Sequence, residues 1–96
     1  MKIIVIAHRS QKVAPEELAK HLPAEAKRAL QFFAEDFVRE IYSRKDGKGA
    51  VLIVEAESEA AARAKLADLP LVRLGMLDLD FYPVGPYRGI VAAANA

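Results

Sequence analysis

Glu55 and Arg39 are the side chains whose positions most suggest proton-transfer chemistry. Glu55 ends the apolar run 51–54, where an acid is costly to bury unless it is paired or needed. Pairing the predicted hairpin about its turn makes Arg39 and Glu55 diagonal neighbours on one face of a sheet. Two interpretations stay open: an ion pair that orders the sheet or a dimer, or a carboxylate that moves a proton on a bound small molecule while Arg39 holds its anionic group.

His8 ends the predicted first strand and is a further candidate acid or base. Imidazole titrates near neutral pH, which suits proton transfer. The first and third strands are predicted to run antiparallel, so His8 should lie at the opposite end of the sheet from Glu55. A histidine at a strand end is also commonly a solvated or capping residue, and both interpretations stay open.

Tyrosines and aspartates supply the candidate substrate-binding groups. Asp78, Asp80 and Tyr82 alternate onto one face of the predicted last strand, and charges on such an edge strand also oppose aggregation. Tyr42 and Tyr87 offer an apolar ring with a hydrogen-bonding tip. We predict Tyr42, Asp80, Tyr82 and Tyr87 as substrate-binding residues. We predict no metal, because the chain has only two histidines, and we also predict no cofactor.

The elements that position these residues begin with a strand over 2–8, which is apolar on both faces, as in a central strand. A helical segment follows over 15–34, and Pro23 predicts two short helices or one kinked helix. Its apolar stripe consists of Leu18, Leu22, Ala26, Leu30 and Phe33.

The next segments, 37–44 and 50–56, are β-rich and flank a turn with two glycines, which predicts a hairpin. The pairing described above puts alternate residues of the first hairpin strand on opposite faces. One face carries Arg39, Ile41, Ile53 and Glu55, and the other carries Glu40, Tyr42, Leu52 and Val54.

A second helix should begin after the N-cap Ser58, bury Ala62, Leu66 and Leu69, and end at Pro70. The last strand covers 77–82. The order strand, helix, strand, strand, helix, strand is that of an α+β, ferredoxin-like split βαβ fold (βαββαβ) with a four-stranded antiparallel sheet. Right-handed crossovers place the first strand between the third and the fourth.

Apolar residues exceed what one small domain can cover. The chain has 96 residues, of which 53% are hydrophobic, and its central strands are apolar on both faces although both helices cover one face. A domain of this size buries only about 60–65% of the surface of its unfolded chain. We therefore predict a homodimer or higher homo-oligomer in which a second sheet covers the open face.

Charge and composition argue against several kinds of partner and site. Fourteen basic and thirteen acidic residues are interspersed, without a basic stripe for nucleic acid. The absence of cysteine excludes disulfides and thiolate metal sites. No segment approaches the roughly 20 apolar residues of a membrane span, so we predict no membrane partner and a cytoplasmic protein. Residues 1–88 are predicted to form a single domain, followed by a C-terminal tail over 89–96.

The sequence resembles the muconolactone isomerase family. The similar residues run from Arg39 through the hairpin and include Ser58, Leu69-Pro70-Leu71 at a helix end and the strand 78–83. The resemblance implies a dimeric α+β barrel in which two ferredoxin-like sheets pair and a ligand binds in the barrel or its mouth. It also implies an isomerase that moves a proton next to a carbonyl of a lactone, enol or aromatic compound, with Glu55, Arg39 and His8 as catalytic residues.

Other functions stay open on the same fold, because one fold supports many chemistries. The group also contains cofactor-free monooxygenases and polyketide cyclases, which would use the same cavity with another substrate. A non-catalytic ligand-binding or assembly protein is the remaining alternative, in which the charged residues only pair the subunits.

Overall fold

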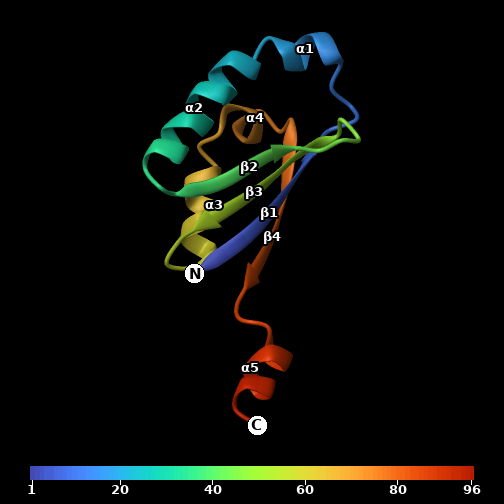
Figure 1. The fold of residues 1–96 in the computed structure, drawn as a ribbon. Helices are drawn as coiled ribbons and strands as arrows, with labels where there is room; N and C mark the ends of the chain where they lie inside the picture. The colour runs from blue at the N-terminus through green and yellow to red at the C-terminus, as the bar shows by residue number, and fades with distance from the viewer.

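The computed structural model describes residues 1–96 as four strands and five helices. Their bounds are β1 (Lys2–Arg9), α1 (Pro15–Ala19), α2 (Leu22–Ala34), β2 (Val38–Ser43), β3 (Gly49–Glu55), α3 (Glu59–Leu66), α4 (Pro70–Arg73), β4 (Leu77–Val84) and α5 (Arg88–Ala94). The strands form one antiparallel sheet in the order β2-β3-β1-β4 (Figure 1). The predicted ferredoxin-like arrangement, with β1 between β3 and β4, is confirmed.

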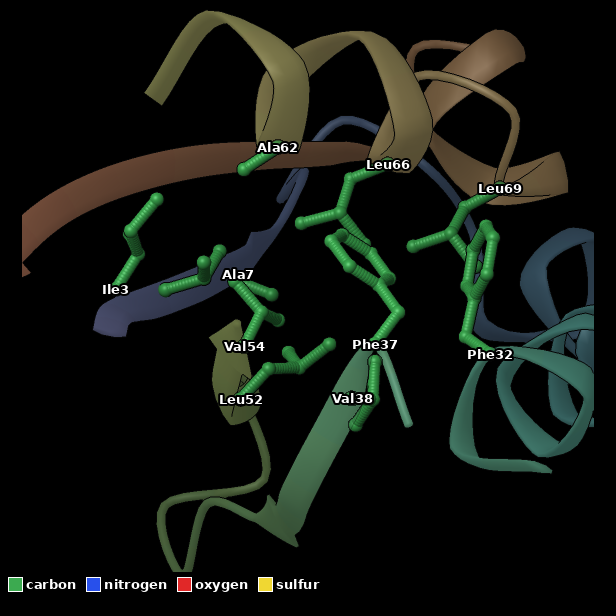
Figure 2. Close-up of a cluster of buried hydrophobic side chains, with 11 residues drawn as sticks. Ile3, Ala7, Phe32, Phe37, Val38, Leu52, Val54, Ala62, Leu66 and Leu69 are labelled. Carbon is green, nitrogen blue, oxygen red and sulfur yellow. The ribbon is translucent and has the colours of Figure 1, made fainter. Parts of the chain in front are cut away.

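The hydrophobic core lies between the helices and one face of the sheet. Every second residue of β1, from Ile3 to Ala7, is at most 1% exposed, whereas the residues between them are partly exposed. Ala62 and Leu66 of α3 point toward these strand residues (Figure 2). The cluster is completed by Phe32, Phe37, Val38, Leu52, Val54 and Leu69. The helices therefore cover one face of the sheet, as predicted.

The helical segment before β2 divides into α1 and α2, one of the two predicted forms. Pro23 stands in the first turn of α2, where a missing N–H costs little. The predicted apolar stripe is right at Leu18, which is buried, and wrong along α2. Leu22, Leu30 and Phe33 are 45%, 68% and 48% exposed, and Phe32 enters the core instead. Because the chain breaks between α1 and α2, the apolar positions of the two helices do not follow a single helical repeat from Leu18 to Ala34.

A β-bulge at Arg39 changes the register of the hairpin. The predicted pairing is right at Val38, which faces Val54, and wrong beyond it, because Arg39 has no partner and Glu40 faces Ile53. An extra residue in one strand turns every later side chain to the other face. Beyond the bulge, the side chains of β2 on the helix-covered face are Ile41 and Ser43, and those on the other face are Glu40 and Tyr42.

The helix capped by Ser58 ends earlier than predicted. The Ser58 hydroxyl accepts a hydrogen bond from the Ala61 N–H at 3.0 Å, which confirms the cap. However, α3 ends at Leu66, and Pro70 does not stop a helix but begins the one-turn helix α4. Leu69 before it is extended, as the residue before a proline prefers to be. The corner Leu69-Pro70-Leu71 is therefore a helix start.

The second face of the sheet has no helix over it. At its centre are four aliphatic side chains that are only partly buried: Ile4, Ile6, Val51 and Ile53. Charged side chains, among them Glu40 and Asp80, stand beside them on the two edge strands β2 and β4. We refer to this surface below as the open face.

The chain leaves the sheet after β4. That strand continues past the predicted end to Val84, and α5 then forms over most of the predicted tail. Every residue of α5 is exposed, and in Figure 1 the helix lies beyond the end of β4, away from the sheet. No helix in the chain combines the length and apolar character that crossing a bilayer requires.

Gly49→Ala should destabilise the fold. Gly49 has φ +148°, and an added Cβ would lie 1.9 Å from the Ala7 carbonyl oxygen. We expect the free energy of unfolding to fall by on the order of 3 kcal/mol, measured by denaturant titration with circular dichroism. Gly85→Ala, where the space is open, is the control and should change the free energy by no more than about 0.5 kcal/mol. Equal effects of the two substitutions would contradict a tight approach of the strands at Gly49.

Candidate functional site

An apolar cavity lies between the helices and the covered face of the sheet. Its volume is about 370 Å³, and 13 of its 17 lining residues are hydrophobic. Leu18 and Leu22 line it from the helices, and Leu52 and Leu79 line it from the sheet. Size and apolar lining are those of a small-molecule site. Its polar side chains come from Arg9, Glu25 and Ser43.

Glu25 is the one carboxylate of this cavity, and a backbone group holds it in place. It stands in the first turn of α2, and its Oε1 accepts a hydrogen bond from the Leu71 N–H at 3.0 Å. Leu71 follows Pro70 in the first turn of α4, where backbone N–H groups have no partner within the helix. The corner Leu69-Pro70-Leu71 therefore provides the donor that orients the Glu25 carboxylate.

Burial raises the pKa of the Glu25 carboxyl above that of an ordinary glutamate. The hydrogen bond from the Leu71 N–H acts in the opposite direction and is the smaller of the two effects. A glutamate with a raised pKa keeps a larger neutral fraction near neutral pH than a solvated one. It is therefore suited both to accept and to release a proton.

Arg9 and Ser43 end the two strands on either side of β3, at the rim of the cavity. Arg9 is the last residue of β1, and its Nη1 donates a hydrogen bond of 2.8 Å to the Gly47 carbonyl oxygen in the β2–β3 turn. Ser43 is the last residue of β2 and faces the cavity because of the bulge at Arg39. The cavity thus has a cation and a hydroxyl in addition to its carboxyl.

Glu55 and Arg39 do not form the predicted pair. Glu55 lies 3.3 Å from the amino group of Met1. The Nε of Arg39 donates to the Asp36 carbonyl oxygen at 2.6 Å. The bulge at Arg39 is the physical reason, because it takes this side chain out of the regular register with β3. Neither residue lines the cavity, and their predicted catalytic roles stay predictions.

His8 lies on the open face, at the opposite end of the sheet from Glu55, as predicted. Its Nε2 is 2.8 Å from Oδ2 of Asp80, and its Nδ1 is 2.9 Å from Nη1 of Arg44. A guanidinium only donates, so we assign Nδ1 as the acceptor and place the imidazole proton on Nε2, which donates to Asp80. Both ring nitrogens are therefore occupied within the protein.

The predicted tyrosines also lie outside the cavity. Tyr42 donates a hydrogen bond to the Glu40 carboxylate, which raises the pKa of the Tyr42 phenol. Tyr82 is on the open face with Asp80, and Tyr87, which immediately precedes α5, is 74% exposed. The structure thus brings His8 and Asp80 together on the open face and leaves the role of these groups a prediction. No three carboxylate or imidazole groups converge in a way that would hold a metal ion.

Sequence reasoning missed Glu25. At the start of a helix, an acid is expected for its favourable interaction with the helix dipole, and such residues are usually exposed. The signal that identifies it is spacing: Glu25 lies three residues after Leu22 and four before Ala29, on the side of α2 that lines the cavity. A carboxylate that shares a helix face with apolar residues lining a cavity is a candidate functional group.

Glu25→Gln should stabilise the protein near neutral pH and reduce its pH dependence. The pKa of Glu25 is raised in the folded protein. At pH values between the ordinary glutamate pKa and this raised pKa, the folded protein therefore binds more protons than the unfolded chain, and its stability falls as the pH rises. Glutamine does not titrate, so the variant avoids this loss of stability, and its amide oxygen can still accept the hydrogen bond from Leu71. Denaturant titrations at about pH 5 and about pH 7 compare the two proteins. A variant less stable than wild type at both pH values would contradict the expectation.

Comparison with known proteins adds evidence on the fold. No family model matches the chain, and no curated protein matches it by sequence. Muconolactone isomerase matches in structure with a TM-score of 0.73 at 16% identity over 92% of both chains. A 5-chloro-2-hydroxyhydroquinone dehydrochlorinase from Burkholderia phenoliruptrix AC1100, in complex with 2,5-dihydroxybenzoquinone, matches at 0.66 and 16% identity, over 93% of this chain and 98% of its own.

A third structure is described as a putative antibiotic biosynthesis monooxygenase from Deinococcus radiodurans. It matches with a TM-score of 0.54 at 16% identity, over 91% of this chain and 95% of its own. At this level of identity the likeness shows the fold and leaves the reaction open. The chain therefore has the ferredoxin-like α+β fold of muconolactone isomerase, as the resemblance in its sequence predicted.

Proposed function

We propose that the protein is a small-molecule isomerase that moves a proton next to a carbonyl group, with Glu25 as the proton carrier. The observation that carries the proposal is a single carboxyl with a raised pKa in an apolar cavity of about 370 Å³. Carboxyls whose pKa is perturbed by burial in a cavity are candidates for acid–base catalysis. The proposed proton carrier is therefore Glu25 and not Glu55, which the sequence favoured. The proposed ligand site also changes: it lies between the helices and the sheet of one subunit, and not between the sheets of two subunits.

The proposed reaction needs one group that takes a proton and returns it. The ionised Glu25 removes a proton from the carbon next to the carbonyl, and the electrons of the broken C–H bond form an enolate. The neutral acid then returns the proton to another carbon of the conjugated system, which shifts the double bond. Atoms and electrons balance without an oxidant or a reductant. The Ser43 hydroxyl at the cavity wall is the available neutral donor for the enolate oxygen.

The apolar lining favours a compact lactone, enol or aromatic substrate. Aliphatic side chains surround Glu25, and they would exclude water from a bound enolate. The dehydrochlorinase of the same fold was crystallised with 2,5-dihydroxybenzoquinone, a small cyclic carbonyl compound, which supports a ligand of this size.

Glu25→Gln should abolish proton transfer, whereas Glu55→Gln, at the far end of the sheet, is the matched control. The assay follows exchange of α protons for deuterium by NMR in a panel of small unsaturated lactones and enols. We expect Glu25→Gln to lower the exchange rate by at least about 100-fold and Glu55→Gln to leave it near wild type. Loss of exchange in Glu55→Gln alone would instead support the earlier assignment of Glu55 as proton carrier.

A second copy of the chain is the proposed cover for the open face. Its four central aliphatic residues are surrounded by polar groups such as His8 and Asp80, the usual arrangement of an interface core and rim. In this arrangement the ion pairs of the open face stand at the edge of the subunit contact. The cavity with Glu25 lies on the other side of the sheet in each subunit.

Ile6→Lys should convert the dimer into monomers, because it places a charge at the centre of the open face. Leu30→Lys, on the exposed side of α2, is the matched control and should leave the dimer intact. Sedimentation velocity at micromolar concentration measures both variants and the wild type. A compact wild-type monomer, or dissociation caused by Leu30→Lys alone, would contradict pairing through the open face.

A further inference from the structure

A polar hollow of about 250 Å³ adjoins the cavity that contains Glu25. The two share Arg9 and Leu18 as lining residues, so Arg9 stands where the apolar space meets the polar one. Beyond this boundary the walls are the β1–α1 loop, with Ser10 and Gln11, and the β2–β3 turn, with Lys48. A molecule in the main cavity can thus extend a polar group into this hollow past Arg9.

This end of the molecule is strongly basic although the whole chain has a net charge of only +1. The loop 9–14 and the turn 44–48 together contain five cations and one carboxylate: Arg9, Lys12, Arg44, Lys45 and Lys48 against Asp46. Clustered charge of one sign at the mouth of a cavity concentrates ligands of the opposite sign.

The one carboxylate of these segments, Asp46, is already engaged. It pairs with the Arg44 guanidinium and accepts a hydrogen bond of 2.9 Å from the Lys48 backbone N–H, and these contacts lower the pKa of its carboxyl. By contrast, the side chains of Arg9 and Lys48 form no ion pair with any carboxylate in the chain. The two cations that line the hollow are therefore free for an external anion.

The geometry points to a substrate that carries an anionic group, a carboxylate or a phosphate, bound between Arg9 and Lys48 while its apolar body occupies the cavity beside Glu25. The hydrogen bond from Arg9 to the Gly47 carbonyl fixes the guanidinium and leaves its other N–H groups available. The placement of the reacting carbon beside Glu25 rests on the proposed function, whereas the anion subsite rests only on the hollow and its charges.

This arrangement gives the substrate a fixed direction in the cavity. An apolar cavity alone would hold a flat ring in several orientations, because its contacts are not directional. An anion fixed at Arg9 restricts the ring to orientations in which one side faces α2 and Glu25. Arg9 and Lys48 are then substrate-binding residues that determine specificity, and Glu25 remains the group that transfers the proton.

Calorimetric titration with three probes of the same aromatic body tests the subsite without any turnover. The probes are 1-naphthaleneacetate, 1-naphthyl phosphate and the neutral 1-naphthaleneacetamide. We expect at least one anion to bind about tenfold or more tighter than the amide, and the anion with the larger ratio identifies the preferred head group. Equal affinity of all three compounds, or no binding of any at millimolar concentration, would overturn the proposal.

Substitutions then distinguish direct contact of the anion with Arg9 and Lys48 from the positive potential of this end of the molecule as a whole. Lys48→Met and Arg9→Met should each reduce the preference for the anion about tenfold and leave amide binding unchanged, while thermal melts check the fold. Lys45→Met removes the same charge from the same turn but from outside the hollow and should have a much smaller effect. An equal loss in Lys45→Met and Lys48→Met would overturn the subsite. Glu25→Gln should keep the preference, so failure of the isomerase proposal and failure of the subsite give different results.

Discussion

The hydrogen bond from the Leu71 N–H to the Glu25 carboxylate is the contact on which the candidate site depends. It joins the first turn of α2 to the first turn of α4, 46 residues further along the chain. Leu71 also packs its side chain against Leu18 of α1 and Met76 before β4, so one residue connects the three helices above the cavity. The Leu71 N–H is available because it lies in the first turn of α4, and Pro70 favours a helix start at this point through its fixed φ.

The two faces of the sheet have different chemistry because the helices cover only one of them. On the covered face, burial favours aliphatic side chains and raises the pKa of the single carboxyl among them. On the open face, charged groups pair with one another, as His8 does with Asp80. Exposed pairs of this kind contribute little to stability. The sheet therefore separates an apolar cavity with one carboxyl from a surface that has an aliphatic centre and charged groups around it.

The order of the strands and helices was predictable from the hydrophobic periodicity of the sequence. The central position of β1 was predictable from the preference for right-handed crossovers. Ala62, Leu66 and Leu69 also follow from spacing, because each faces the sheet regardless of where α3 ends. The site was not predictable in the same way. The bulge at Arg39 is a local tertiary feature that hydrophobic alternation does not reveal, and it separated Arg39 from Glu55. Glu25 was missed because a helix-start acid is ordinarily solvated, and only the packing of α4 over α2 buries it.

The bulge in β2 also bears on how relatives of this chain would differ from it. One unpaired residue at position 39 decides that Ile41 and Ser43 line the cavity while Glu40 and Tyr42 face away. Regular pairing of Arg39 with Ile53, with the β2–β3 turn one residue shorter, would exchange the two sets without any substitution, replacing a hydroxyl and an aliphatic group by a phenol and a carboxylate. Closing the bulge in this way would remodel one wall of the cavity at once. Changes in the length of the β2–β3 turn therefore give such a scaffold a short route between substrates, although the residues of the strand itself stay the same.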